Sequence, residues 1–298
     1  MLWPALRYSE WSDTCATLQL WTQIVGKIRM EKTPPVNHWW HVTLYVTSRG
    51  LGTSLIPDGE RIFEIDFDFL AHRLVISTTD DDRREIALVP MTVAEFYDRV
   101  MNALRELKIG VTINTLPSEV ADPIRFEDDR VHRSYDADAA RRFWQVLLLS
   151  SRVMYDFRSL FIGKVSPPHL FWGGFDLAVT RFSGRRAPLH GPVPGIPLAV
   201  VREAYSHECS SAGFWPGGTG FDATYYAYAY AEPEGFSKAT VRPAAAAWND
   251  QMREFMLPYE AVRTAPDPAG ALMEFLQSTY DAGANLARWP RAELERAV

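Results

Sequence analysis

Histidine and carboxylate side chains occur in this sequence in combinations that suit acid–base catalysis. His207 and Glu208 are neighbours in a segment that also carries serine and cysteine, and the ordinary pKa of histidine lies near neutrality. His41 and Asp176 each lie within an aromatic stretch. We therefore take His41, Asp176, His207 and Glu208 as candidate catalytic residues. The alternative for His207 is a histidine whose hydrogen bonds hold a loop in place.

Three carboxylates alternate with apolar residues between Phe63 and Phe69, so that Glu64, Asp66 and Asp68 share one face of a predicted strand. This row is either a solvated outer face or a concave site where crowded carboxylates raise one another's pKa or bind a cation. Oxygen ligands suit Mg²⁺ or Ca²⁺, whereas histidine ligands shift the preference toward Zn²⁺, Mn²⁺ or Fe²⁺. A divalent metal is an open alternative, and its candidate ligands are His41, Asp66, Asp68 and His207.

Tryptophan and arginine side chains supply the candidate groups for binding a substrate. Indole rings suit the walls of a pocket, and a guanidinium group binds a carboxylate or phosphate through two parallel hydrogen bonds. The candidates are Trp39, Arg49, Trp172, Arg181 and Trp215. The sequence contains no glycine-rich phosphate-binding fingerprint, so we expect no nucleotide cofactor.

Two further features concern possible ligand contacts in the second half of the chain. Tyr226, Tyr228 and Tyr230 alternate along one predicted strand, where they either pack the sheet or form a stacking wall for an aromatic or sugar-like ligand. Cys209 follows Glu208, but no nucleophile signature surrounds it, so we expect it to be a poor nucleophile.

The composition limits the class of protein. Of the 298 residues, 47% are hydrophobic and 23% are charged, which is typical of a globular protein. A net charge of −6 argues against duplex nucleic acid, whose phosphates require a basic surface. No apolar stretch could span a membrane, no secretion signal is recognisable, and two cysteines cannot build a disulfide framework. We expect a cytoplasmic protein that binds a small-molecule ligand, without nucleic acid or membrane partners.

Hydrophobic periodicity and capping residues predict the elements that would position these side chains. Helices are expected over 13–28, from Thr92 onward, over 136–162 and from Asp267 onward. Pro34-Pro35 would end the helix over 13–28, and Gly163 would end the helix over 136–162. Strands are expected over 38–47, 63–69, 73–78, 85–89, 171–180 and 225–230. In the strand over 38–47, His38 and His41 would point to opposite sides, which argues against a two-histidine metal site.

The order of these elements repeats along the chain. At one constant offset, the residues that coincide are Pro34-Pro35 with Pro167-Pro168, Trp39 with Trp172, and Leu44 with Leu177. We interpret this as an internal duplication. The predicted fold is α+β: two pseudo-repeated halves, each an antiparallel sheet packed with helices, form one compact globule. The halves comprise residues 1–125 and 126–298, and the second contains a long inserted loop at 183–222.

Several motifs resemble those of one uncharacterised bacterial family of about this chain length. They are Trp3-Pro4 with Trp11, His38-Trp39-Trp40-His41, Phe175–Arg185, Ser206-His207-Glu208 and Gly213–Gly217. The resemblance extends over nearly the whole chain and implies a bacterial, cytoplasmic protein. The family is a domain of unknown function and lends no activity, substrate or catalytic residue, so the functional hypothesis rests on the residues alone.

The leading hypothesis is an enzyme that acts on a small polar or anionic molecule through a histidine–carboxylate site. Alternation along the strands leaves polar and aromatic side chains on the sheet face away from the helices. We expect the site on that face, closed by Glu203–Gly218. The alternative is a non-catalytic protein that binds a small molecule, or a homodimer joined through the aromatic face.

Overall fold

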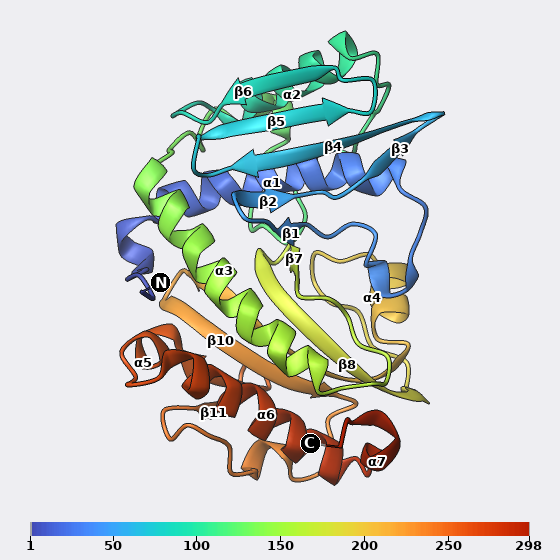
Figure 1. Cartoon of the computed structure of the whole chain (residues 1–298), viewed down its shortest axis with the longest axis vertical. Coiled ribbons are helices and arrows are strands. Elements are labelled where there is room, and N and C mark those ends of the chain that lie inside the picture. Colours follow the sequence, from blue (N-terminus) through green and yellow to red (C-terminus); the bar gives the residue numbers. More distant parts are fainter. Residues whose placement is uncertain (1, 298) are drawn as a thin grey trace.

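Each half of the chain contains a long helix, an antiparallel sheet and a further helix (Figure 1). In the computed structural model, which describes residues 2–297, the helices are α1 (Ser12–Lys32), α2 (Val93–Glu106), α3 (Ala137–Ser159), α4 (Leu198–Ala204), α5 (Tyr259–Arg263), α6 (Pro268–Leu286) and α7 (Arg291–Leu294). Short 3-10 turns are η1 (Tyr8–Glu10), η2 (Asn37–Trp39), η3 (Phe126–Asp128) and η4 (Phe236–Lys238). The predicted α+β class is confirmed.

The first sheet has six antiparallel strands in the order β1-β2-β4-β5-β6, with β3 paired to β4. Its strands are β1 (Tyr45–Val46), β2 (Gly50–Gly52), β3 (Ile56–Asp58), β4 (Arg61–Asp68), β5 (Arg73–Thr78) and β6 (Arg83–Ala87). The strands predicted over 63–69, 73–78 and 85–89 are thereby confirmed, with β6 lying slightly earlier than expected. Along β4, apolar residues are buried on one face and the three carboxylates occupy the other, as the alternation predicts.

Helices α1 and α2 cover the apolar face of the first sheet. Phe96 of α2 stacks on Trp21 of α1 with ring centroids 4.5 Å apart, and it also stacks on Phe67 of β4 at 6.3 Å. The predicted cap of α2 is confirmed, because the Thr92 side chain accepts a hydrogen bond from the Glu95 N–H.

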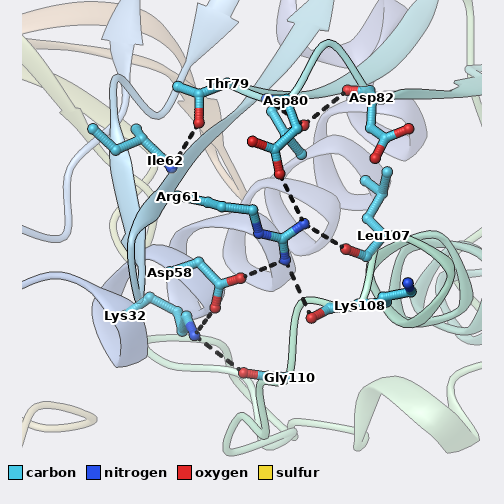
Figure 2. A network of polar contacts seen from close by, with 11 residues as sticks. Lys32, Asp58, Arg61, Ile62, Thr79, Asp80, Asp82, Leu107, Lys108 and Gly110 are labelled. Atoms are coloured by element: carbon cyan, nitrogen blue, oxygen red, sulfur yellow. Dashed lines mark hydrogen bonds and ion pairs between the residues drawn. The ribbon is translucent and has the colours of Figure 1, made fainter.

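A polar network fixes the end of α1 against the first sheet (Figure 2). Lys32 Nζ lies 2.6 Å from one Asp58 oxygen, and Arg61 donates to the other at 2.9 Å. Arg61 also donates to the carbonyls of Leu107 and Lys108, which follow α2. Burial opposes ionisation of Asp58, but the hydrogen bonds from Lys32 and Arg61 hold its pKa below the ordinary value.

The second sheet also has six antiparallel strands, in the order β11-β12-β10-β9-β8-β7. These are β7 (His169–Phe171), β8 (Asp176–Arg186), β9 (His207–Gly218), β10 (Phe221–Tyr230), β11 (Ala247–Asn249) and β12 (Glu254–Pro258). Helices α3 and α6 cover one face. Ser150 of α3 is bonded to the Tyr225 hydroxyl of β10 at 2.7 Å, and Arg181 of β8 lies against Phe157 of α3 and Tyr280 of α6.

The helix ends agree with the capping prediction in the second half and differ in the first. Asp136 and Asp267 cap α3 and α6 by accepting from backbone N–H groups, as expected. The first helix begins at Ser12, with Trp11 rather than Asp13 as N-cap, and continues to Lys32. The C-cap of α3 is Leu160, so Gly163 lies beyond the helix end.

Two predicted aromatic strands are correct only in part. Residues 38–47 form a 3-10 turn, a further turn and only the short β1, because His38 and Trp39 adopt the left-handed conformation with φ of 58° and 62°. Aromatic and β-branched residues favour strands, but tertiary contacts override this preference here. The segment 171–180 is interrupted by a turn before Asp176, where Phe175 has a φ of 57°, and the two parts belong to the paired strands β7 and β8.

The segment 183–222, expected to be an inserted loop, is irregular mainly over 187–197. The rest includes the end of β8, helix α4, all of β9 and the start of β10. Its later part is ordered and packed, as the aromatic content of Glu203–Gly218 predicts, because β9 lies between β8 and β10 in the sheet. A turn in the glycine run after Trp215 connects β9 to β10.

The two halves are joined by backbone pairing and share one hydrophobic core. Leu44 and Leu170 exchange both backbone hydrogen bonds, at 2.9 and 2.7 Å, which connects the edges of the two sheets. The Trp172 indole donates to the Val42 carbonyl at 2.8 Å. A single cluster of buried apolar side chains includes residues from both halves. Within residues 2–297, no helix has both the length and the apolar character needed to cross a membrane.

Candidate functional site

A cavity of about 580 Å³ lies on the face of the second sheet opposite α3 and α6. Alternate residues of adjacent strands form its floor, because side chains one residue apart point to opposite faces. The floor residues are Asp176, Ala178, Thr180 and Phe182 of β8, Cys209, Ser211 and Trp215 of β9, Tyr226 and Tyr228 of β10, and Glu254 of β12. The volume is in the range of sites that bind small molecules.

The walls and roof come from segments far apart in the sequence. Helix α1 contributes Lys27 and Met30, the turn η2 contributes His38–Trp40, and the connection after α2 contributes Glu119. The segment between β8 and β9 adds Gly195–Ile196 and much of α4, up to Tyr205. Both halves of the chain therefore build one cavity. The residues of the 183–222 segment that close the cavity lie mainly N-terminal to Glu203–Gly218, the stretch that the sequence predicted would close the site.

Asp176 is the central carboxyl of the cavity. The Tyr226 hydroxyl donates a hydrogen bond to Asp176 Oδ2, and the Trp215 ring packs on the Tyr226 ring with centroids 4.5 Å apart. Burial raises the pKa of Asp176 to about 6, although the bond from Tyr226 opposes this rise. Burial also raises the pKa of Tyr226 well above its ordinary value, so its hydroxyl keeps the proton that it donates.

Two further carboxyls line the same cavity. Burial raises the pKa of Glu254 to about 8, and the negative charge of Asp176 adds to this effect. The same two causes raise the pKa of Glu119 to about 7. Part of Glu119 is exposed to solvent, but its carboxyl lies against Gly173 in the cavity lining, whereas Glu254 is half-buried as a whole residue. The described part of the chain places no arginine among the residues that line this cavity.

Two glycines make room for these groups. A Cβ atom at Gly173 would lie 2.0 Å from Glu119 Oε1, so only glycine lets this carboxyl approach the backbone there. A Cβ atom at Gly213 would lie 2.5 Å from the Tyr226 hydroxyl oxygen, so the tyrosine crosses β9 above a residue without a side chain. The two glycines thus position Glu119 and the hydroxyl that binds Asp176.

Left-handed backbone conformations of non-glycine residues occur in the cavity wall. His38, Trp39 and Glu119 have φ of 58°, 62° and 57°. Such conformations are unfavourable for these residues and are often found at functional sites.

Two polar atoms of the cavity lining have no hydrogen-bond partner within residues 2–297. They are Glu254 Oε2 and Trp39 Nε1, and both are inaccessible to solvent. An unsatisfied buried polar atom is costly, which makes these two atoms candidate contacts for a bound molecule.

His38 connects the cavity to α4. Its Nδ1 lies 3.0 Å from the Ala204 carbonyl, and its Nε2 lies 2.8 Å from Lys164 Nζ. Since a carbonyl only accepts and an ammonium only donates, Nδ1 carries the proton and the imidazole is neutral. Burial lowers the pKa of His38, and the positive charge of Lys164 adds to this effect while the Ala204 carbonyl opposes it. Through its hydrogen bond to Ala204, His38 therefore positions α4, which forms part of the cavity roof.

Four of the residues selected from the sequence lie together in the cavity. They are Trp39, Trp172, Asp176 and Trp215. Tyr226 and Tyr228 also line it as floor residues, and their rings stack along the sheet with centroids 6.3 Å apart.

The three other candidate catalytic residues lie outside this cavity lining. His41 is buried, and its Nδ1 accepts a hydrogen bond from the Val36 N–H at 3.1 Å. His207 contacts Ser206 and packs edge-on against His38, with ring centroids 5.9 Å apart. The carboxylate of Glu208 is bound by Arg185 at 2.7 Å, on the opposite side of β9 from Cys209. Histidine is thus not brought next to Asp176.

The two candidate arginines also lie elsewhere. Arg49 is bonded to Asp68 at 2.6 Å on the exposed face of the first sheet. Arg181 is buried on the helix-covered face of the second sheet, where it donates to the Phe157 carbonyl. Successive residues of a strand point to opposite faces, so two residues an odd number of positions apart lie on different faces. Arg181 is five positions from Asp176 and therefore cannot meet it on one face of β8.

The candidate metal ligands are distributed over both halves. Asp66 and Asp68 lie on the first sheet, and His41 and His207 lie at separate places near η2 and β9. Over residues 2–297, the structure brings together no group of three or more His, Cys, Asp or Glu side chains suited to a metal ion.

Sequence reasoning missed Glu119 and Glu254. Glu119 lies in an irregular connection and Glu254 begins a short strand, so neither belongs to a motif. The antiparallel register of β10 and β12 places Glu254 opposite Tyr228 on the neighbouring strand. The alternating tyrosines were the only signal in the sequence for this face.

The fold and the cavity define an α+β protein with two six-stranded sheets and one aromatic, acidic cavity between the halves. A family model described as a family of unknown function, DUF5996, matches residues 3–296. The chain therefore belongs to this family, which confirms the resemblance to an uncharacterised domain of about this length. Comparison with curated proteins gave no match, and comparison with solved structures gave none either.

Proposed function

We propose that the protein is an enzyme that binds a small organic molecule in the cavity of the second sheet and acts on it by general acid–base catalysis. The observation that carries this proposal is that Asp176 and Glu254, two carboxyls without a basic partner, line one aromatic cavity. Clefts that combine apolar walls with convergent ionisable groups are the usual place for catalysis.

The two carboxyls have different roles in this proposal. Near neutral pH, Asp176 with a pKa of about 6 is mostly ionised and suits a general base. Glu254 with a pKa of about 8 is mostly protonated and suits a general acid. Pairs of groups whose environments separate their pKa values are typical of acid–base sites. Tyr226 is a positioning residue that holds the Asp176 carboxylate.

Two observations support this mechanism, one against a cysteine nucleophile and one against a homodimer. Burial raises the pKa of the Cys209 thiol to about 12, which argues against a thiolate nucleophile. Trp39 and Trp172 line a cavity rather than a flat exposed patch, which argues against a dimer joined through an aromatic face.

Depletion of a metabolite mixture tests this proposal. The purified protein is incubated with a bacterial small-molecule extract, and consumed and formed compounds are identified by mass spectrometry. We expect at least one compound to be converted, with Asp176→Asn and Glu254→Gln each slowing conversion by about 100-fold or more. Glu64→Gln on the first sheet is the matched control and should convert at the wild-type rate.

Two outcomes of this experiment would count against the proposal. Conversion by folded Asp176→Asn and Glu254→Gln at the wild-type rate would overturn the assignment of the two carboxyls. Retention of a compound without conversion, lost on both substitutions, would favour the non-catalytic binding protein instead.

We further propose that the protein is a bacterial, cytoplasmic one whose halves arose by internal duplication. The equal strand number of the two sheets and the helix that precedes each sheet support the duplication. Cys15 and Cys209 are both free and buried, which agrees with a reducing compartment.

A further inference from the structure

We propose that the molecule bound in this cavity is an organic cation, a protonated amine carried on a flat apolar body. This inference rests on the proposed function, because it specifies the ligand of the same cavity. It reverses the expectation of an anionic substrate.

The charge of the cavity lining is the first argument. Glu119, Asp176 and Glu254 all line the cavity, and the described lining residues include one lysine, Lys27, and no arginine. The Lys27 ammonium donates to the Leu116 carbonyl at 2.8 Å, and burial lowers its pKa to about 8, so one lysine faces three carboxyls. An anion would meet this excess of carboxyls, whereas a cation would add to the counter-charge that one lysine supplies.

The aromatic lining is the second argument. Aromatic faces attract cations, and cages of tryptophan and tyrosine recognise organic ammonium groups. Lys27 lies 5.8 Å above the Trp172 ring, so this wall already accommodates one ammonium group. The rings of Trp39, Trp215 and Tyr228 line the same cavity and are available for a flat ligand.

The unpartnered atoms are the third argument. Glu254 Oε2 is a buried acceptor with no donor in the protein, and one oxygen of Asp176 is bound by Tyr226. Asp176 and Glu254 line the same cavity on one face of the second sheet. An ammonium group has three N–H donors and can bind both carboxyls. Trp39 Nε1 is an unpartnered donor, so the apolar body of the ligand should also carry an acceptor.

Three probes of matched shape test the charge of the ligand. Tyramine, tyrosol and 4-hydroxyphenylacetate share a phenol ring on a short chain that ends in an ammonium, a neutral hydroxyl and a carboxylate, respectively. Isothermal titration calorimetry should show tyramine binding at least tenfold more tightly than tyrosol, with no binding of the carboxylate. Between about pH 5.5 and 7.5, tyramine affinity should increase, because the cavity carboxyls ionise while the amine stays protonated.

Variants assign the binding to the cavity. Both substitutions keep the shape of the side chain: Asp176→Asn removes the charge of an ionised carboxyl, and Glu254→Gln removes a carboxyl that would ionise when a cation binds. Each should weaken tyramine binding at least tenfold. Glu64→Gln on the first sheet is the control and should not change it. Circular dichroism on each variant confirms that it is folded.

The outcomes separate this inference from the proposed function. Tyrosol or the carboxylate binding as tightly as tyramine, or tyramine affinity unchanged in both folded variants, would overturn the cation assignment. Absence of binding by all three probes would overturn it as well. The proposed function would still stand if the metabolite experiment showed conversion of a neutral or anionic compound that depends on Asp176, and it would fail with this inference if nothing were converted.

Discussion

The carboxylates of the first sheet and those of the second-sheet cavity are the same kind of group in opposite surroundings. On the first sheet, Arg49 and two backbone N–H groups bind Asp68 and lower its pKa against the effect of burial. In the cavity, no basic side chain binds Asp176 or Glu254, and burial raises the pKa of both. Paired carboxylates stabilise the fold, whereas unpaired ones in a cavity are available to a ligand.

Asp66 shows that a raised pKa alone does not define a site. It lies on the first sheet between Glu64 and Asp68, and burial followed by the charges of these neighbours raises its pKa to about 6. Asp66 does not line the cavity, and a Cβ at Gly52 would lie 2.2 Å from its Oδ1, so one oxygen packs against backbone. The cavity therefore carries the functional assignment, and the pKa values only describe how its groups would work.

The largest effect on tyramine binding should come from a substitution that introduces a cationic side chain into the cavity. Ser211→Lys places an ammonium on the cavity floor, where Ser211 is buried. The lysine should occupy the place of the ligand's cation and weaken tyramine binding by about 100-fold. Ser77→Lys places the same cation beside Glu64 on the first sheet and should leave binding unchanged. Equal binding by both folded variants, measured by calorimetry, would contradict the comparison.

The two regions should also respond to pH with opposite signs. Folding raises the pKa of Glu254 from 4.5 to about 8, so the folded state binds the proton more strongly and its stability decreases as pH rises through this window. Glu254→Gln removes this loss, so the free energy of unfolding of the variant relative to that of wild type should rise by about 2 kcal/mol between pH 5 and pH 8.

The contribution of Asp68 to the stability of the fold should have the opposite pH dependence. Its pKa is lowered in the folded state, so its contribution is present above its unfolded pKa and is lost as pH falls through the folded value. Asp68→Asn should therefore destabilise the protein at neutral pH and lose this effect in acid. Urea unfolding at several pH values measures both variants, and the same sign for both would refute the comparison.

A smaller effect should come from the hydrogen bond that positions Asp176. Tyr226→Phe removes the hydroxyl that donates to this carboxylate and lowers its pKa. The midpoint of the pH dependence of tyramine binding should move upward by about one unit, with the ring packing against Trp215 retained. Tyr228→Phe is the matched control. A midpoint that moves equally in both variants would show that Tyr226 does not position Asp176.

The smallest effect should come from the exposed ion pair of the first sheet. Arg49 is 55% exposed, and such pairs contribute little because solvent screens them. Arg49→Ala should reduce the free energy of unfolding by about 1 kcal/mol or less and leave tyramine binding unchanged. A loss of binding would instead return Arg49 to the substrate-binding role that the sequence suggested.

The sequence predicted the elements with a clear period and failed where tertiary contacts control the backbone. The alternation along β4 and the start of α2 at Thr92 depend on local physics, and both were predicted correctly. The stretch 38–47 has the composition of a strand, but left-handed residues at its start bend it into the cavity wall.

The candidate site was predictable only in part for the same reason. Asp176 and Trp215 follow from one rule, that alternate residues of adjacent strands share a face, whereas Trp172 reaches the cavity from the turn between β7 and β8. The same rule excludes Arg181. Glu119 and Glu254 enter the cavity through the packing of distant segments, which spacing within one sequence does not encode.

The most direct test of this account is a carboxyl titration by carbon-13 NMR, with and without tyramine. We expect Asp176 and Glu254 to titrate at about 6 and about 8 in the free protein, and both pKa values to fall when tyramine binds. Asp68 should titrate below its ordinary value in both samples. Ordinary pKa values for Asp176 and Glu254 that tyramine does not move would contradict the central claim that the second-sheet cavity holds unpaired carboxyls for a cationic ligand.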